Sequence, residues 1–235
     1  MRIGVVAPST PIERAVADRV SALGEEVFPG TEIVFHPQCF ETWRHFAGEV
    51  LARLGPAAWA KAYLGYSDAG FLLAGLYKAG FGSVAHGPMP QDMIREGGDA
   101  AVRRALSWLV DRSPQALEPH VAADARHAAF NITVFSQLLG TPLEPDLAGH
   151  VLMLEEVSEY SYRTDRTMFH ITSNPSVRRV AGIRLGRCSL VPENDPDFGE
   201  SEEQIVRHWC ERAGIAWLGA ADIGHDSRNR VVPFG

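Results

Sequence analysis

A serine in a tight turn is the first residue of this chain that could perform covalent chemistry. Residues 64–68 read LGYSD, between a short apolar run and a segment whose apolar residues recur at helical spacing. A strand, a Gly-x-Ser turn and a helix are the parts of a nucleophile elbow, in which free amides at the helix N-terminus favour negative charge. Ser67 is therefore a candidate nucleophile. Ala69 stands where the hydrolase elbow has its second glycine, and helix N-capping by Ser67 or Asp68 is the alternative explanation.

A histidine and a glutamate could complete the chemistry of this serine. His225 lies in a polar turn, DIGHD at residues 222–226, where an imidazole could serve as a base. Glu155 follows an apolar strand expected over residues 150–154, and a carboxylate at the end of a parallel strand could orient that imidazole. The alternatives are a surface histidine and an ordinary charged strand end. The order Ser67, Glu155, His225 is that of α/β hydrolases, which indicates a possible arrangement and no shared ancestry.

A further histidine lies in the segment VAHGPM. His86 is a candidate for substrate binding, and the alternative is a buried histidine that shapes the site. His86, His225, Asp222 and Asp226 could in principle hold a metal ion. Neither HExxH nor HxH spacing occurs among them, so we predict no metal and no cofactor.

The segments around these residues predict alternating strands and helices. Residues 3–7 and 31–35 read as short buried strands, and the segment between them reads as a helix. Thr10 and Glu13 form a capping-box pattern at its start, and Gly24 is expected to end it. A β-α-β start of this kind predicts a parallel α/β layer.

The remaining elements predict two α/β domains. We expect an N-terminal parallel-sheet domain over residues 1–110 that carries the nucleophile, a linker over 111–128, and a C-terminal mixed α/β domain over 129–235 that carries the acid and base, with a cleft between them. The further elements expected are strands at 62–64, 150–154 and 180–185 and helices at 68–78, 100–110, 130–139, 162–171 and 202–213.

Composition limits the partners. The chain has 235 residues, of which 46% are hydrophobic, so it can bury a sizeable core. Its net charge is −7 and its basic residues are scattered, so we predict no nucleic-acid partner. Three cysteines without CxxC spacing argue against a disulfide framework. No apolar run reaches the roughly 18 residues of a membrane span, and we predict a cytoplasmic protein without a membrane partner.

Taken together, several segments resemble the bacterial LD-carboxypeptidase family of serine peptidases, which includes the microcin-immunity peptidases. They occur in the family's order and cover nearly the whole chain. They are IGVVAPS at 3–9, LGYSD at 64–68, HGPM at 86–89, LLGTP at 138–142, LEEVSE at 154–159 and the GH pair at 224–225.

The resemblance implies a mechanism and a substrate. In that family the serine of the Gly-x-Ser-Asp turn is the nucleophile, which here is Ser67, and Glu155 and His225 complete its triad. The amide of Asp68 would serve as one oxyanion donor. The implied fold has two α/β domains, and proteins of the family are usually homodimers. The implied substrate is a murein tetrapeptide, cleaved between an L-centre and a terminal D-alanine during cell-wall recycling.

Two alternatives stay open at this point. A microcin-immunity-type peptidase would cleave a peptide–nucleotide amide, and an aromatic residue stacked on a base would favour it; Tyr160, Tyr162 and Trp217 are available. A non-catalytic binding protein for murein fragments would keep the cleft and lack a complete oxyanion hole.

The sequence departs from the family pattern after residue 48. There the family has a helix, a strand and an Arg-Gly-Gly-Tyr-Gly turn that supplies a second oxyanion amide. Here Glu49 follows Gly48 directly, and no such turn occurs in the sequence. Bonded neighbours have Cα atoms about 3.8 Å apart. We predict a clearly larger separation between Gly48 and Glu49, whereas a normal bond without another amide facing Ser67 would favour the non-catalytic alternative.

Overall fold

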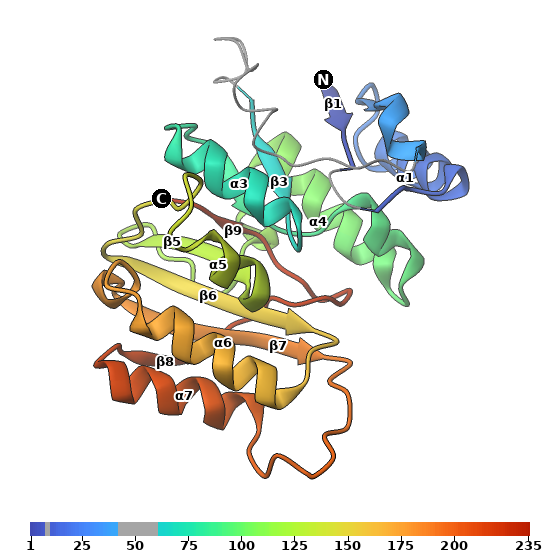
Figure 1. Cartoon of the computed structure of the whole chain (residues 1–235). Helices are drawn as coiled ribbons and strands as arrows, with labels where there is room; N and C mark the ends of the chain where they lie inside the picture. The colour runs from blue at the N-terminus through green and yellow to red at the C-terminus, as the bar shows by residue number, and fades with distance from the viewer. Residues whose placement is uncertain (8–9, 42–60) are drawn as a thin grey trace.

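The computed structural model describes residues 1–7, 10–41 and 61–235 (Figure 1). The predicted break between Gly48 and Glu49 lies outside the described residues. The first half contains β1 (Arg2–Val5), α1 (Arg14–Val27), β2 (Glu32–Phe35), β3 (Tyr63–Gly65), α3 (Ala69–Lys78), β4 (Val84–His86) and α4 (Gly98–Asp111). The second half contains β5 (Arg126–Asn131), α5 (Ile132–Leu138), β6 (His150–Val157), α6 (Ser161–Ser173), β7 (Gly182–Ser189), α7 (Glu202–Ala213), β8 (Trp217–Ala220) and β9 (Val232–Pro233).

The second half forms a four-stranded parallel sheet in the order β5-β6-β7-β8. Figure 1 shows α5, α6 and α7 along one face of this sheet. Parallel strands covered by helices are buried on both faces, which requires nearly continuous apolar runs. The middle of β6 fits this requirement, because Leu152, Met153 and Leu154 are all fully buried. This sheet forms the main hydrophobic core.

The first half forms two smaller sheets. β1 pairs with β2 in parallel, and β3 pairs with β4 in parallel. β9 then pairs antiparallel with β4, with Val232 opposite His86. The last strand therefore returns to a sheet of the first half, and the backbone amide of Gly235 donates to the carbonyl of His127 on β5 at 3.0 Å. The predicted α/β class is confirmed, and the division at 111–128 stays a prediction.

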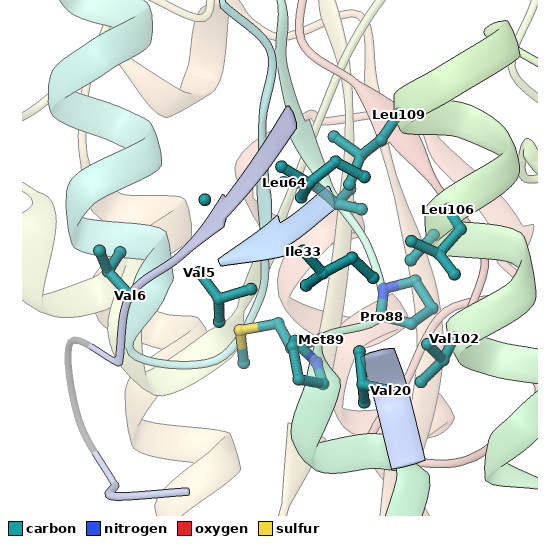
Figure 2. Close-up of a pocket in the computed structure, with 14 residues that line it drawn as sticks. Val5, Val6, Val20, Ile33, Leu64, Pro88, Met89, Val102, Leu106 and Leu109 are labelled. Carbon is teal, nitrogen blue, oxygen red and sulfur yellow. The ribbon is translucent and has the colours of Figure 1, made fainter. Parts of the chain in front are cut away.

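An apolar cavity of about 120 Å³ lies where the two small sheets face each other. Figure 2 shows Val5 of β1, Ile33 of β2 and Leu64 of β3 on its walls, together with Met89 and with Leu106 of α4. In the described part of the chain, no strand joins β1 and β3 into one sheet. Within the same residues, no helix is long and apolar enough to cross a bilayer.

The first helix differs from its prediction at both ends. It begins after Glu13, which is its N-cap, so the predicted cap at Thr10 was wrong. It also continues past Gly24 to Val27. A side chain at Gly24 would place its Cβ 2.4 Å from Cδ1 of Ile33, so this glycine permits the close approach of β2 and does not end the helix.

The helix predicted over residues 130–139 was wrong at its start. Phe130 belongs to β5, and α5 begins only at Ile132. A short, fully buried apolar run does not distinguish a strand from a helix by its periodicity. Asn131 makes the transition, because its Oδ1 caps α5 by accepting from the amide of Val134 at 3.1 Å. Its Nδ2 also donates to Oε1 of Glu156 at 2.5 Å.

Because Asn131 has two roles, its removal should destabilise the fold more than the loss of an ordinary helix cap does. Asn131→Ala should lower the free energy of unfolding by about 2–3 kcal/mol, since it removes the cap and also a buried donor to the Glu156 carboxylate. The matched control is Ser201→Ala at the exposed N-cap of α7, which should cost about 1 kcal/mol. Urea denaturation measures both, and equal losses would show that the Glu156 bond contributes nothing.

Candidate active site

Ser67 occupies a strained turn between β3 and α3. Its φ is +58°, in the left-handed region that non-glycine residues rarely adopt. The amide of Gly70 donates to the Ser67 carbonyl at 2.8 Å and starts the helix. A Cβ at Gly65 would lie 3.0 Å from the Cβ of Ala69, so a larger residue there would crowd the tight turn. A strand, a strained serine and a helix N-terminus are the parts of a nucleophile elbow.

A buried hydrogen bond joins the other two candidate residues. Nδ1 of His225 lies 2.6 Å from Oε2 of Glu155, and the two side chains are 8% and 0% exposed. β6 continues through both glutamates to Val157, so their side chains alternate between its faces. Glu156 accepts instead from the amide and hydroxyl of Thr133 on the other side of the strand. The strand is longer than predicted, and Glu155 is the carboxylate that meets the imidazole.

The surroundings of Glu155 determine the state of this pair. Burial raises the pKa of Glu155, and the hydrogen bond from His225 opposes that rise by favouring the ionised form. A carboxylate on Nδ1 orients the ring and selects the tautomer that leaves Nε2 as the acceptor. The pair can therefore hold a base whose second nitrogen is available to take a proton.

The turn that carries His225 is clamped by one arginine. Nη1 of Arg187 donates to Asp222 at 2.5 Å and Nη2 donates to Asp226 at 2.8 Å, while Nε forms a second ion pair with Asp226. The backbone amide of Arg187 also donates to the carbonyl of Ile223 at 2.9 Å. Side-chain and backbone bonds from one residue of β7 thus fix the chain on both sides of His225.

A glycine of β7 allows the turn that carries His225 to pack closely against the sheet. A Cβ at Gly186 would lie 2.7 Å from the carbonyl oxygen of Ile223 and 3.0 Å from the Cβ of Glu155. Only a residue without a side chain lets the turn lie this close to β6 and β7. Neither Gly186 nor Arg187 was predicted from the sequence. Gly186 directly follows the strand expected over residues 180–185, and β7 in fact continues through it to Ser189. A glycine within a strand often marks a close backbone approach, so this residue was the available signal.

Ser67 and His225 line the same cavity, which has a volume of about 220 Å³. Asp68, the N-cap residue of α3, also lines it, so its amide lies where the helix dipole favours an anion. No hydrogen bond joins the Ser67 hydroxyl to His225 within the described residues, and their direct contact stays a prediction. Arg95 lines this cavity too, although sequence analysis did not select it.

His86 lies behind the cavity. It is 1% exposed, and its ring centroid is 5.7 Å from that of Tyr66, whose ring in turn is 4.7 Å from His225. Burial, with the charge of His225, lowers the pKa of His86 to about 3. His86 is therefore a neutral ring packed under Tyr66. This position supports the alternative of a buried histidine that shapes the site, and its role in substrate binding stays a prediction.

The half of the chain that carries Glu155 and His225 is similar to a known protein family. Residues 126–235, which include both Glu155 and His225, match the family model of the LD-carboxypeptidase C-terminal domain. A Synechocystis protein named "Putative carboxypeptidase" is 31% identical over 181 residues, which are 74% of this chain and 59% of the relative. Residues 126–235 of the chain belong to the LD-carboxypeptidase family as its C-terminal domain. The resemblance predicted from its motifs is thereby confirmed.

Other LD-carboxypeptidase relatives extend the comparison. The murein tetrapeptide carboxypeptidase of Pseudomonas aeruginosa is 26% identical over 195 residues, which are 76% of this chain and 62% of the relative. The chain spans about three fifths of the length of the curated relatives it matches.

Solved structures share the fold across the chain. A muramoyltetrapeptide carboxypeptidase from Oxalobacter formigenes superposes with a TM-score of 0.78 at 18% identity and covers 100% of this chain and 93% of its own. The structure of MccF in complex with glutamyl sulfamoyl guanosine superposes with a TM-score of 0.77 at 16% identity, and the match covers 100% of this chain and 91% of MccF. At these identities the likeness establishes the fold alone.

The close approach at Gly186 generates a stability prediction. In this LD-carboxypeptidase C-terminal domain, Gly186→Ala should lower the free energy of unfolding by about 1–3 kcal/mol, because the new methyl group meets the Ile223 carbonyl. Gly82→Ala is the control, since a Cβ there would have no heavy atom within 4 Å. Denaturant unfolding compares the two. Similar values would mean that the turn moves away from β7 without cost.

The Arg187 clamp generates a pH prediction. Burial alone would raise the pKa of Asp226, but the bonds from Arg187 outweigh it and lower the pKa below its ordinary value of 3.8. A lowered folded-state pKa contributes stability above about pH 4 that is lost as the pH falls through the folded-state value. Asp226→Asn should therefore be less stable than the parent at pH 7, with the gap shrinking toward pH 3 in urea titrations. In an Arg187→Met background, the difference in unfolding free energy between the protein with Asp226 and its Asp226→Asn variant should be small at every pH. If the difference in the Arg187 protein persisted at pH 3, the ion pair with Arg187 would not be its cause.

Proposed function

We propose that this protein is a serine-type carboxypeptidase that hydrolyses the bond between an L-centre and a terminal D-alanine in murein tetrapeptides. The observation that carries the proposal is the buried Glu155–His225 hydrogen bond beside a cavity that the strained Ser67 shares. The naming of relatives as murein carboxypeptidases supports the substrate.

The proposed mechanism has two stages. His225 takes the Ser67 proton as the hydroxyl oxygen attacks the carbonyl carbon of the L-centre, while Glu155 orients the imidazole and stabilises its charged form. The tetrahedral intermediate collapses, the amide bond breaks, and His225 returns the proton to the departing nitrogen of D-alanine. Water then attacks the acyl-enzyme by the same route, which releases the shortened peptide and restores Ser67.

The charge on the carbonyl oxygen needs hydrogen-bond donors. The amide of Asp68 is the proposed first donor, because Asp68 follows the nucleophile and lines the cavity at the N-terminus of α3. Loss of one oxyanion donor costs on the order of 100-fold in turnover, so a working enzyme requires a second. In the family that donor comes from a turn that does not occur in this sequence, and the position after Gly48 where it would stand lies outside the described residues. A homodimer and a cytoplasmic location remain predictions.

The nucleotide-cleaving alternative has less support in the site. Tyr160 and Tyr162 stack on one another with ring centroids 5.3 Å apart, and Trp217 lines a different cavity beside α7. Within the described residues, none of the three lines the cavity of Ser67. None of the three candidate aromatic residues therefore lies at the described nucleophile. Tyr66 does line the cavity, but its ring packs against His225 and its hydroxyl donates to Asp92.

One assay separates the proposals. Purified protein incubated with murein tetrapeptide should release free D-alanine, and a peptide–nucleotide amide should be cleaved more slowly. Preference for the nucleotide would support the microcin-immunity type. Binding of the tetrapeptide without release of D-alanine would support the non-catalytic alternative.

The triad predicts a distinctive pattern of kinetic losses. Ser67→Ala and His225→Ala should each lower kcat by on the order of 1,000-fold or more, and the double variant should be little worse, because the two residues act in one step. Glu155→Gln should leave the fold intact and also lower kcat. Ser136→Ala, on the exposed face of α5, is the control and should retain the parent's rate. Additive losses at residues 67 and 225 would count against a shared nucleophilic step.

A further inference from the structure

The cavity of Ser67 contains one cationic side chain besides any charge on His225. Arg95 follows the short 3-10 helix η3 (Pro90–Ile94), and its side chain is 35% exposed. Among the described residues that line the cavity, it is the only arginine or lysine. A fixed positive charge beside a nucleophile suggests recognition of an anionic group on the molecule that reacts there.

A buried carboxylate holds this arginine in place. Asp92 is 1% exposed, and its Oδ1 accepts from Nε of Arg95 at 3.0 Å and from the Tyr66 hydroxyl at 2.6 Å. Its Oδ2 accepts from the amide of Met89 at 2.8 Å. Because Tyr66 immediately precedes Ser67 in the chain, Asp92 ties the guanidinium and the nucleophile's turn to the same point. The spacing between cation and nucleophile is therefore set by short, buried contacts.

The guanidinium keeps donors for a ligand. Its hydrogen bond to Asp92 uses Nε, and the side chain of Tyr66 forms a further hydrogen bond to it. A guanidinium has five N–H donors, so these two contacts leave donors for a ligand. Burial alone would lower the pKa of Arg95, but Tyr66 and Asp92 outweigh that effect and raise it, so the group stays cationic. Guanidinium N–H groups in a planar fork match the two oxygens of a carboxylate.

The other residues of the cavity limit the size and charge of the ligand group that can bind beside Arg95. Among the described residues that line it, the apolar side chains are small or aliphatic except for the ring of Tyr66, and Asp68 is the only carboxylate. An anion beside Asp68 would be repelled, whereas an anion at Arg95 is attracted. The volume of about 220 Å³ leaves room for a small group. The apolar lining residues are Val6, Ala7, Ile12, Ala69, Met89 and Pro90.

We propose that Arg95 binds the free terminal carboxylate of the residue that leaves, and that it makes the site specific for substrates ending in an unblocked acid. This assignment rests on the proposed function, since it identifies the group recognised on the leaving side of the bond. Carboxypeptidase specificity then follows from an ion pair at a fixed distance from Ser67, and not from the length of the peptide.

The experiment compares murein tetrapeptide with the same peptide ending in D-alaninamide. The parent should cleave the acid with a kcat/KM roughly 10- to 100-fold above that for the amide, because a hydrogen-bonded charged pair is lost. Arg95→Gln should reduce kcat/KM on the acid by a similar factor and leave the value on the amide nearly unchanged. Arg95→Lys should recover part of the preference. Arg103→Gln, which removes an exposed arginine paired with Glu26, is the charge-matched control and should behave as the parent.

A binding measurement keeps this test independent of catalysis. In Ser67→Ala protein with Arg95 intact, calorimetry should show tighter binding of the acid than of the amide. If the parent cleaves neither peptide, the proposed function fails, and the calorimetry still tests Arg95. Equal binding of acid and amide, or equal losses on both substrates in Arg95→Gln, would overturn the assignment.

Discussion

The hydrogen bond between Glu155 and His225 constrains much of the second half of the molecule. A fully buried carboxylate is costly to ionise, and here its main compensation is an imidazole delivered by a turn 70 residues later. Bringing that turn to β6 requires the bare backbone of Gly186 and the ion pairs of Arg187. The parallel sheet supplies a rigid base for both, since β6 and β7 are neighbours. Much of the local architecture thus serves one short contact.

The strain at Ser67 is sustained from the opposite side. A left-handed φ at a serine persists only where its surroundings fix the backbone. β3 enters the turn, α3 leaves it, and the start of α3 lies close to β5 and α5, where a Cβ at Gly70 would be 3.1 Å from Val134. Tyr66 is anchored by Asp92 on the other flank. The nucleophile's turn is therefore held between the two halves of the chain.

Local chemistry was readable from the sequence, and long-range pairing was not. The turn at Ser67 and the helix over residues 202–213 were predicted because glycine, serine and capping residues act on their immediate neighbours. Glu155 was found, but β6 was ended too early because a buried carboxylate looks like a strand end. Arg187 was missed because its partner Asp226 is 39 residues away. Arg95 pairs with Asp92 only three residues before it, but the contact that brings this pair to the nucleophile is made by Tyr66, 26 residues from Asp92. Such contacts leave no periodic signal.

The return of β9 to β4 also determines when the site can form during synthesis. β4 and β6 are made long before β9, so a growing chain holds the β4 edge unpaired and has no partner for Glu155. The turn at Ser67 depends mostly on nearby residues and can form early. The imidazole can meet Glu155 only after the segment between β8 and β9 has been made, and β9 then closes against β4. Contacts of such large sequence separation form slowly, because loop closure must come first. The pair of Glu155 and His225 is therefore among the last parts of the described site to form as the chain is made.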